Sequence, residues 1–254
     1  NVHTRNGIFN DGQGAKSYVH VGNNWGNAAW YANAMYYGDA SGGYLPFTAL
    51  DIAGHEMSHG VTQATSGLAY SGDAGGLNEA TSDIFGTMVE YYANNSNDPG
   101  DYVIGEKLFT NNAAMNKAIR WMFKPSLDGI SYDCYPGSLA GVDPHYSSGV
   151  GNHFYYLLAE GAVVPTGFGA GTWANLSTSQ MVCNGNTSLA GIGRDKASKI
   201  WFRALTTYMT SGTTYPAARA ATLQAAADLY GNGSAEYNAV NAAWAAVNVS
   251  AVPV

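Results

Sequence analysis

Residues 51–62 read DIAGHEMSHGVT, and the organisation of the whole chain can be worked out from this stretch. Apolar residues recur at helical spacing from residue 50 to residue 65, which predicts an α-helix there. Positions i and i+4 of a helix share one face, so the imidazoles of His55 and His59 can reach a single metal ion. Glu56 directly follows His55 and is predicted to point toward a coordination position left open for water.

A site of this kind needs a third protein ligand. Residues 77–83 read LNEATSD and lie on a second predicted helix, residues 78–94. Glu79 is the candidate third ligand, and Asp83 lies one helical turn beyond it, where its carboxylate can accept the N–H of a ligating histidine. His-Glu-x-x-His alone occurs by chance in many chains, so the downstream Glu and Asp make zinc the stronger interpretation.

The pattern differs on the two sides of the first helix. Residues 1–50 are rich in Gly, Asn, Tyr and Trp, and turn signals separate short β-favouring pieces at residues 17–21 and 34–37. A Gly/Ser-rich break at residues 71–76 precedes the second helix, and helical patterns dominate the remainder. Further helices are predicted at residues 148–160, 195–210, 216–230 and 235–248.

We therefore expect an α+β fold in three parts, with the active-site cleft between the first and the last. A partial, β-rich N-terminal domain comprises residues 1–50. A central zinc-binding helix comprises residues 51–66. A mainly α-helical C-terminal domain comprises residues 67–254.

Composition excludes several classes of protein. The 254 residues suffice to bury a core, and 46% hydrophobic residues is ordinary for a globular protein. A net charge of −7 with only 11 Lys and Arg argues against nucleic-acid binding and against docking on anionic membranes. The sequence has no run of about 18 apolar residues, so no membrane span is predicted.

Two features bear on cellular location. Cys134 and Cys183 would form one disulfide in a secreted chain and would remain free thiols in a cytosolic one, and their presence alone leaves both possibilities open. The chain starts at Asn1 with no Met and no basic-then-apolar leader, which predicts a processed product or a fragment.

Several further motifs follow one another in a fixed order along the chain. They are NAAW at residues 27–30, YGD at 37–39, LPF at 45–47, GLAY at 67–70, IGE at 104–106, HYSSG at 145–149 and GIGRDK at 191–196. Together with the two helical stretches, this series resembles the thermolysin family of neutral zinc metalloproteases over essentially the whole chain. Its general texture is most similar to the actinobacterial members.

The resemblance implies a role for each member of the metal site. His55, His59 and Glu79 match the zinc ligands. Glu56 matches the general base that takes a proton from the attacking water and passes it to the leaving amine. Asp83 matches the carboxylate that accepts the N–H of the first histidine.

A second set of residues is implied to act on the substrate. Tyr70 and His145 match the donors that hydrogen-bond the tetrahedral oxyanion, and Asp143 matches the carboxylate that orients this histidine. The groups that bind the substrate backbone are matched by Asn27, Ala28 and Arg120. The pocket for the residue after the scissile bond is matched by Ile52, Ile104 and Ile119. The histidines interpreted as structural are His3, His20 and His153.

The resemblance also implies a calcium site, because calcium takes several carboxylate and carbonyl oxygens. The predicted ligands are Asp51, Glu90, Asp101, Val103 and Glu106. A second calcium in this cluster would need a further carboxylate where Val103 offers only its backbone oxygen, so one calcium is predicted. Asp98 is an extra or alternative ligand.

Three more features follow from the resemblance. Cys134 and Cys183 flank the segment of His145, and we hypothesise a disulfide that braces this segment. Members of the family carry a longer β-rich region before the position that matches Asn1, so most of that region is predicted to be missing. Ala29 stands where relatives carry a bulky aromatic residue, which predicts a roomier unprimed pocket.

We therefore predict a secreted, extracellular zinc metalloendopeptidase that is made as a zymogen, is monomeric and cleaves polypeptides before bulky hydrophobic residues. Its own cleaved propeptide or the missing N-terminal segment is a further predicted partner, whereas nucleic acid and membranes are not. The alternative is an inactive, peptide-binding relic of the same fold, which need not retain Glu56, Tyr70 and His145 together. A zinc hydrolase acting on a non-peptide is disfavoured by the backbone-binding Asn27 and Arg120.

Overall fold

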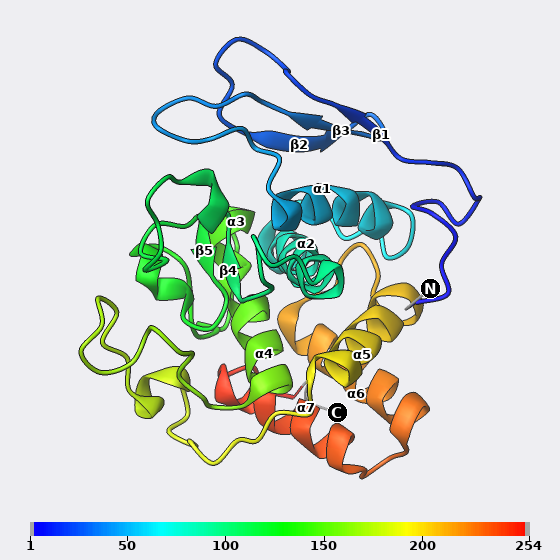
Figure 1. Cartoon of the computed structure of the whole chain (residues 1–254). Helices are drawn as coiled ribbons and strands as arrows, with labels where there is room; N and C mark the ends of the chain where they lie inside the picture. The colour runs from blue at the N-terminus through cyan, green and yellow to red at the C-terminus, as the bar shows by residue number, and fades with distance from the viewer. Residues whose placement is uncertain (1–2, 252–254) are drawn as a thin grey trace. The chain divides into compact units, whose positions relative to one another are not determined.

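The computed structural model describes residues 3–251 (Figure 1). The chain forms two compact units, one comprising Asn1–Ala64 and Thr81–Trp121 and the other Thr65–Ala80 and Met122–Val254. The division falls within helix α2, Gly72–Ala93, which contributes its first part to the second unit and its remainder to the first. One continuous helix therefore belongs to both units.

The first unit contains a three-stranded sheet that packs on helix α1, Leu50–Gln63 (Figure 1). The strand β3 is central, parallel to β1 and antiparallel to β2. The two residues between β2 and β3, Ala32 and Asn33, have φ values of 47° and 61°, the positive values that a type I′ hairpin turn requires. The strands are β1 Lys16–Tyr18, β2 Ala28–Tyr31 and β3 Ala34–Tyr37.

Two short strands and a single helical turn complete the first unit after α2. The two strands pair antiparallel, and Ile104 lies opposite Arg120 in this ladder. The ladder brings Arg120, which is far from α2 in sequence, into the unit that contains the second half of α2. These elements are β4 Val103–Ile104, the 3-10 turn η1 Glu106–Leu108 and β5 Arg120–Trp121.

Helix α1 and the part of α2 in the same unit approach each other at two glycines. A Cβ on Gly86 would lie 2.4 Å from the backbone oxygen of Asp51, and a Cβ on Gly54 would lie 2.9 Å from the Cα of Gly86. Real side chains do not tolerate such distances, so only glycine permits this approach. The close crossing brings the His55 side chain of α1 within reach of Asp83 on α2.

The second unit is mainly helical. Helix α4 is buried along nearly its whole length and packs against α5 and α7. Phe154 of α4 stacks on Trp244 of α7, with ring centroids 3.6 Å apart, and Trp244 Nε1 donates to the Thr222 hydroxyl of α6 at 2.8 Å. The helices are α3 Pro144–Ser147, α4 Gly149–Glu160, α5 Arg194–Thr207, α6 Tyr215–Tyr230 and α7 Ala235–Ala246, with 3-10 turns η2 Pro125–Asp128 and η3 Thr178–Met181.

The predicted fold class is confirmed, because a small strand-containing N-terminal region precedes a mainly helical C-terminal part. The structure also contains the predicted disulfide between Cys134 and Cys183. None of the helices within residues 3–251 is long and apolar enough to cross a membrane.

The predicted helix break at residues 71–76 is wrong, because α2 begins at Gly72 and runs through this stretch. A Cβ on Gly75 would lie 2.9 Å from the Pro144 ring, and a Cβ on Gly76 would lie 2.7 Å from Ser147 Oγ. The two glycines therefore allow α2 to pack closely against α3, and they do not end the helix. Strand β2 was also missed by the sequence analysis.

We expect Gly86→Ala to lower the free energy of unfolding by about 1–3 kcal/mol, because the new methyl group would overlap the backbone oxygen of Asp51. Denaturant unfolding followed by circular dichroism measures the change. Gly14→Ala is the matched control, since nothing lies within 4 Å of a Cβ at that position. Equal stability of the two variants would contradict the close-approach argument.

Candidate metal centre and active site

His55 and His59 lie one turn apart on α1. Their Nε2 atoms are 3.0 Å apart and their ring centroids 4.7 Å apart, so the two rings converge. His55 is only 5% exposed, whereas His59 is half-buried. Two imidazole nitrogens that converge in this way are suited to bind one metal ion.

Asp83 orients the first of these histidines. Its Oδ1 lies 2.8 Å from His55 Nδ1, and Arg120 donates to Oδ2 from Nε and to Oδ1 from Nη2, both at 2.7 Å. Burial opposes ionisation of Asp83, but the charge of Arg120 and the hydrogen bonds from both partners hold the pKa of this carboxyl well below its usual range. The ionised Asp83 accepts from Nδ1–H of His55, which leaves Nε2 for a metal.

Glu79 lies on α2 one helical turn before Asp83 and is completely buried. Tyr70 Oη donates to Oε1 of Glu79 and lies 3.3 Å from Nε2 of His145. The same His145 nitrogen is 3.6 Å from Oε1 of Glu79. Asp143 fixes the ring, because its carboxylate accepts the His145 backbone N–H at 2.9 Å and contacts Nδ1 at 2.8 Å.

The candidate metal ligands form one group. A nitrogen of each of His55 and His59 and a carboxylate oxygen of Glu79 lie within 4.8 Å of one another. Two imidazoles and one carboxylate are a donor set typical of catalytic zinc, which keeps a further position for water. The bond from Asp83 to His55 adds the partner that fixes the ligating tautomer. The residues present therefore fit a zinc ion.

Glu56 is buried on α1 and is 6% exposed. Burial, and after it the charge of Glu56, raises the pKa of Tyr37 on β3 to about 12. This phenol therefore lies near the candidate base and stays protonated at neutral pH. No role was predicted for Tyr37 from the sequence. The β-favouring piece predicted at residues 34–37 was the available signal, because alternate residues of a strand point to the same face.

The residues expected to contact substrate lie at several places in the first unit. Asn27 is exposed immediately before β2, and Ala28 is buried at the start of that edge strand. Ile52 and Ile104 are buried, while Ile119 is half-buried and donates its backbone N–H to the Ile104 oxygen at 2.8 Å. Arg120 is the remaining residue predicted to contact substrate, and its guanidinium forms an ion pair with Asp83.

A cluster of carboxylates forms a second candidate metal site, within the first unit. Oxygens of Asp51, Glu90 and Glu106 lie within 4.8 Å of one another, and all three residues are buried. Glu90 Oε1 and both carboxylate oxygens of Glu106 have no hydrogen-bond partner among the described residues. Burial and then the charges of Asp51 and Glu106 raise the pKa of Glu90 to about 10. Burial and then Asp51 also raise the pKa of Glu106.

The other predicted members of this cluster are close by. Asp101 donates its backbone N–H to Glu90 Oε2 at 3.1 Å and accepts from the backbone N–H of Val103 at 2.7 Å. Burial raises the pKa values of Asp51 and Asp101 to about 6 each. Asp98 instead forms an ion pair with Lys107 at 3.5 Å. Buried carboxylates this close together are costly unless a cation or protons neutralise them, so the cluster fits a bound calcium ion.

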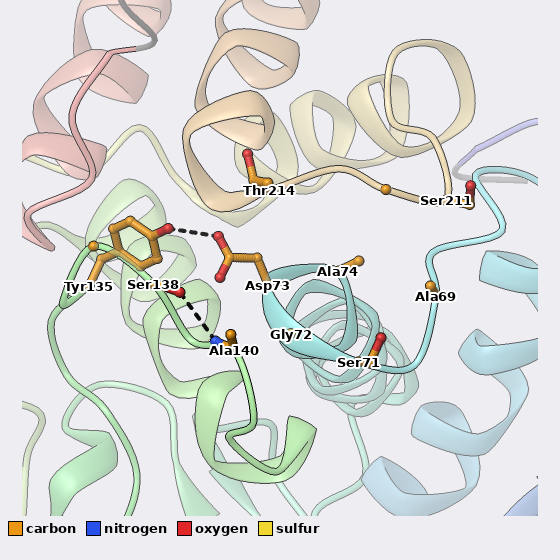
Figure 2. A pocket seen from close by; sticks show the side chains of 12 residues that line it. Ala69, Ser71, Gly72, Asp73, Ala74, Tyr135, Ser138, Ala140, Ser211 and Thr214 are labelled. Carbon is orange, nitrogen blue, oxygen red and sulfur yellow. Dashed lines mark hydrogen bonds between the residues drawn. The ribbon is translucent and has the colours of Figure 1, made fainter.

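A pocket of about 410 Å³ opens beside the start of α2, in the second unit (Figure 2). Small side chains and hydroxyl groups line it. Its carboxylate, Asp73, accepts from the Tyr135 hydroxyl at 2.8 Å and from the backbone N–H of Tyr215 at 3.1 Å, and Figure 2 shows the first of these bonds. Through these hydrogen bonds, Asp73 links three segments of the second unit. None of the predicted site residues lines this pocket.

Comparison with known proteins gives matches along nearly the whole chain. Residues 1–63 match the family described as thermolysin metallopeptidase, catalytic domain, and residues 66–249 match thermolysin metallopeptidase, alpha-helical domain. The transglutaminase-activating metalloprotease of Streptomyces mobaraensis is 52% identical over 251 residues, which is 98% of this chain and 32% of that protein. A thermolysin of Alicyclobacillus acidocaldarius subsp. acidocaldarius is 40% identical over 255 residues, 98% of this chain and 42% of that protein.

The chain thus spans about a third to two fifths of the length of these relatives. Among solved structures, it is similar to the precursor of protealysin, a metalloproteinase from Serratia proteamaculans. The TM-score is 0.74 at 27% identity, and the match covers 98% of this chain and 73% of the other.

We expect Asp83→Asn to lower the free energy of unfolding by about 3–5 kcal/mol, because it would remove the negative charge that Asp83 places against the buried guanidinium of Arg120. The measurement is denaturant unfolding in the absence of added metal. Asp228→Asn is the control, since it removes one partner of the surface ion pair with Arg203 and should change stability far less. Similar losses in both variants would refute the argument.

Proposed function

This chain belongs to the thermolysin family of metallopeptidases, and from that premise we propose that it carries the catalytic machinery of a secreted zinc-dependent endopeptidase. The observation that carries the proposal is the convergence of His55, His59 and Glu79, with the buried Glu56 next in sequence to His55. The relatives named above are metalloproteases, which supports a polypeptide as substrate.

The protein side chains divide the chemistry among them. Zinc held by the three ligands would supply Lewis acidity, which activates water near neutral pH and polarises the scissile carbonyl. Glu56 takes the proton of the attacking water and passes it to the leaving amine. Tyr70 and His145 donate to the oxyanion as it develops. Asp143 accepts from Nδ1 of His145, so a protonated ring offers its Nε2–H to the oxyanion.

Substrate preference follows from apolar side chains in the first unit. Ile52, Ile104 and Ile119 form the proposed lining of the pocket for the residue after the scissile bond, and they favour a bulky hydrophobic side chain there. Asn27 and Ala28 at the edge strand β2 bind the substrate backbone, because an edge strand has unpaired backbone groups to offer. Arg120, whose guanidinium is paired with Asp83, is the third group proposed to bind the substrate backbone.

The buried carboxylates Asp51, Glu90 and Glu106, the half-buried carboxylate Asp101 and the backbone oxygen of Val103 hold one structural calcium ion in this proposal. Support comes from the carboxylate oxygens of Glu90 and Glu106 that lack hydrogen-bond partners. Calcium takes six to eight oxygen ligands, and these four side chains provide most of them. The similar precursor structure supports a further proposal, that this chain is made as a zymogen whose propeptide is removed.

We expect the zinc-loaded chain to cleave casein and a blocked hydrophobic dipeptide, to lose this activity with 1,10-phenanthroline and to regain it with zinc. Glu56→Gln should lower kcat/KM by about 100-fold or more with the zinc content unchanged, because the base is lost while the ligands remain. Cleavage by Glu56→Gln at the unaltered rate would contradict the assignment. No cleavage by the unaltered chain with one zinc bound would favour the inactive, peptide-binding relic.

We expect calcium to raise the melting temperature. The free energy of unfolding should increase by about 2.7 kcal/mol when free calcium exceeds its Kd by 100-fold. Because the pKa values of these carboxyl groups are raised, the metal-free folded state binds their protons more tightly than the unfolded state does. The contribution of these groups to the free energy of unfolding is therefore present at low pH and is lost as pH rises. Calcium must displace those protons, and its effect should be larger at about pH 8 than at about pH 5.

The matched variants for this experiment are Glu90→Gln and Glu236→Gln. Glu90→Gln should remove most of the calcium response, since it deletes a buried ligand. Glu236 pairs with Lys196 on the surface, so its variant should respond like the unaltered chain. A calcium response that survives in Glu90→Gln would place the ion elsewhere.

A further inference from the structure

His153 lies within α4 and is completely buried. Its Nδ1 lies 2.8 Å from the backbone oxygen of Asp133, and its Nε2 lies 2.8 Å from the backbone oxygen of Met181. Both ring nitrogens of this histidine therefore meet a carbonyl oxygen at hydrogen-bond distance. Sequence spacing gave His153 no role beyond a structural one.

These two contacts bear on the charge of the ring. A carbonyl oxygen can only accept a hydrogen bond, and a neutral imidazole carries a proton on only one nitrogen. A neutral ring would set the bare nitrogen against a carbonyl oxygen in the core, and neither atom would have a hydrogen-bond partner in that contact. Only a ring protonated on both nitrogens satisfies both carbonyls.

The titratable groups that act on this ring are Asp133 and Lys124. Burial lowers the pKa of His153, and Lys124 acts in the same direction, while Asp133 and the two backbone carbonyls favour the protonated ring. Lys124 is itself paired with the Asp133 carboxylate, with an N–O distance of 2.5 Å, which reduces its effect on the histidine. Together these influences leave the pKa of His153 below its ordinary value, with burial as the largest cause. The two carbonyl oxygens at 2.8 Å are the geometric observation that favours a proton on both nitrogens.

The two carbonyls belong to the segments that the disulfide joins. Asp133 directly precedes Cys134, and Met181 lies two residues before Cys183. His153 and the disulfide therefore tie together the same two segments, one through hydrogen bonds and the other through a covalent bond.

The segment held by His153 leads to the candidate catalytic histidine. Tyr132, which precedes Asp133, donates its backbone N–H to the backbone oxygen of Tyr146 at 3.3 Å. Tyr146 directly follows His145 in sequence. A displacement of the Asp133 segment would thus be transmitted to the backbone beside His145.

We propose that His153 is a positioning residue, a buried imidazolium that holds the segment Tyr132–Cys134 in place and through it keeps His145 oriented toward the substrate oxyanion. The catalytic part of this inference rests on the proposed peptidase function. The charge of the ring does not, and the two parts are tested separately.

The charge is tested on the unaltered protein labelled with ¹⁵N-histidine. Long-range ¹H–¹⁵N correlation spectra distinguish a ring protonated on both nitrogens from a neutral ring, and His153 is one of only six histidines to assign. We expect both His153 nitrogens to be protonated at neutral pH. A bare nitrogen on this ring would overturn the proposal. The spectrum needs neither catalysis nor a variant, so it decides the charge even if the chain proves not to be a peptidase.

The positioning role is tested by His153→Gln, with His20→Gln as the matched control. His20 pairs with Asp39 on the surface and lies outside the proposed site, so its variant should retain full activity. For His153→Gln we expect kcat on the blocked dipeptide to fall by about 10- to 100-fold, with KM and zinc content unchanged, because a misoriented His145 affects the transition state more than substrate binding. An unchanged kcat in folded His153→Gln would overturn the positioning role.

Discussion

The ionised carboxylate of Asp83 is the group on which the rest of the site depends. An isolated charge in a protein interior is costly, and Asp83 is completely buried. It is tolerated because Arg120 donates two hydrogen bonds and His55 a third. Each bond orients the group that makes it, so one carboxylate fixes the tautomer of a candidate zinc ligand and anchors strand β5. It also sets which face of α2 points toward α1, and Glu79 lies one turn away on that face.

Much of the fold could be predicted from local sequence, because helical periodicity is a property of neighbouring residues. The helix predicted over residues 50–65 corresponds closely to α1, Leu50–Gln63. The start of α2 could not be predicted, since Gly75 and Gly76 read locally as a break. Their actual role depends on Pro144 and Ser147, which lie far away in sequence. The role of the glycines at the α1–α2 crossing could not be predicted from local sequence either. Glycine is required there only because the two helices approach each other closely in the folded chain.

The candidate site divides in the same way. His55, His59 and Glu79 were predicted because helix geometry and one downstream carboxylate nearly suffice to define a three-ligand site. The carboxylate cluster was predicted only from the family resemblance, because its members are widely separated along the chain. Tyr37 and His153 were given no functional role. Tyr37 lies near a buried carboxylate, and His153 contacts two backbone carbonyls. No sequence pattern specifies which of these groups a side chain will contact after folding.

Helix α2 belongs to both compact units, and this has a consequence for how the chain unfolds. Backbone hydrogen bonds in a helix join residues four positions apart, so several of them cross the division between the two units. If either unit lost its share of the 22-residue helix, those bonds would be lost, and the remaining part would end at the division with unpaired backbone groups. Partial opening of one unit is thereby disfavoured. Since proteolysis acts on opened segments, a shared helix of this kind would protect a peptidase from other molecules of itself.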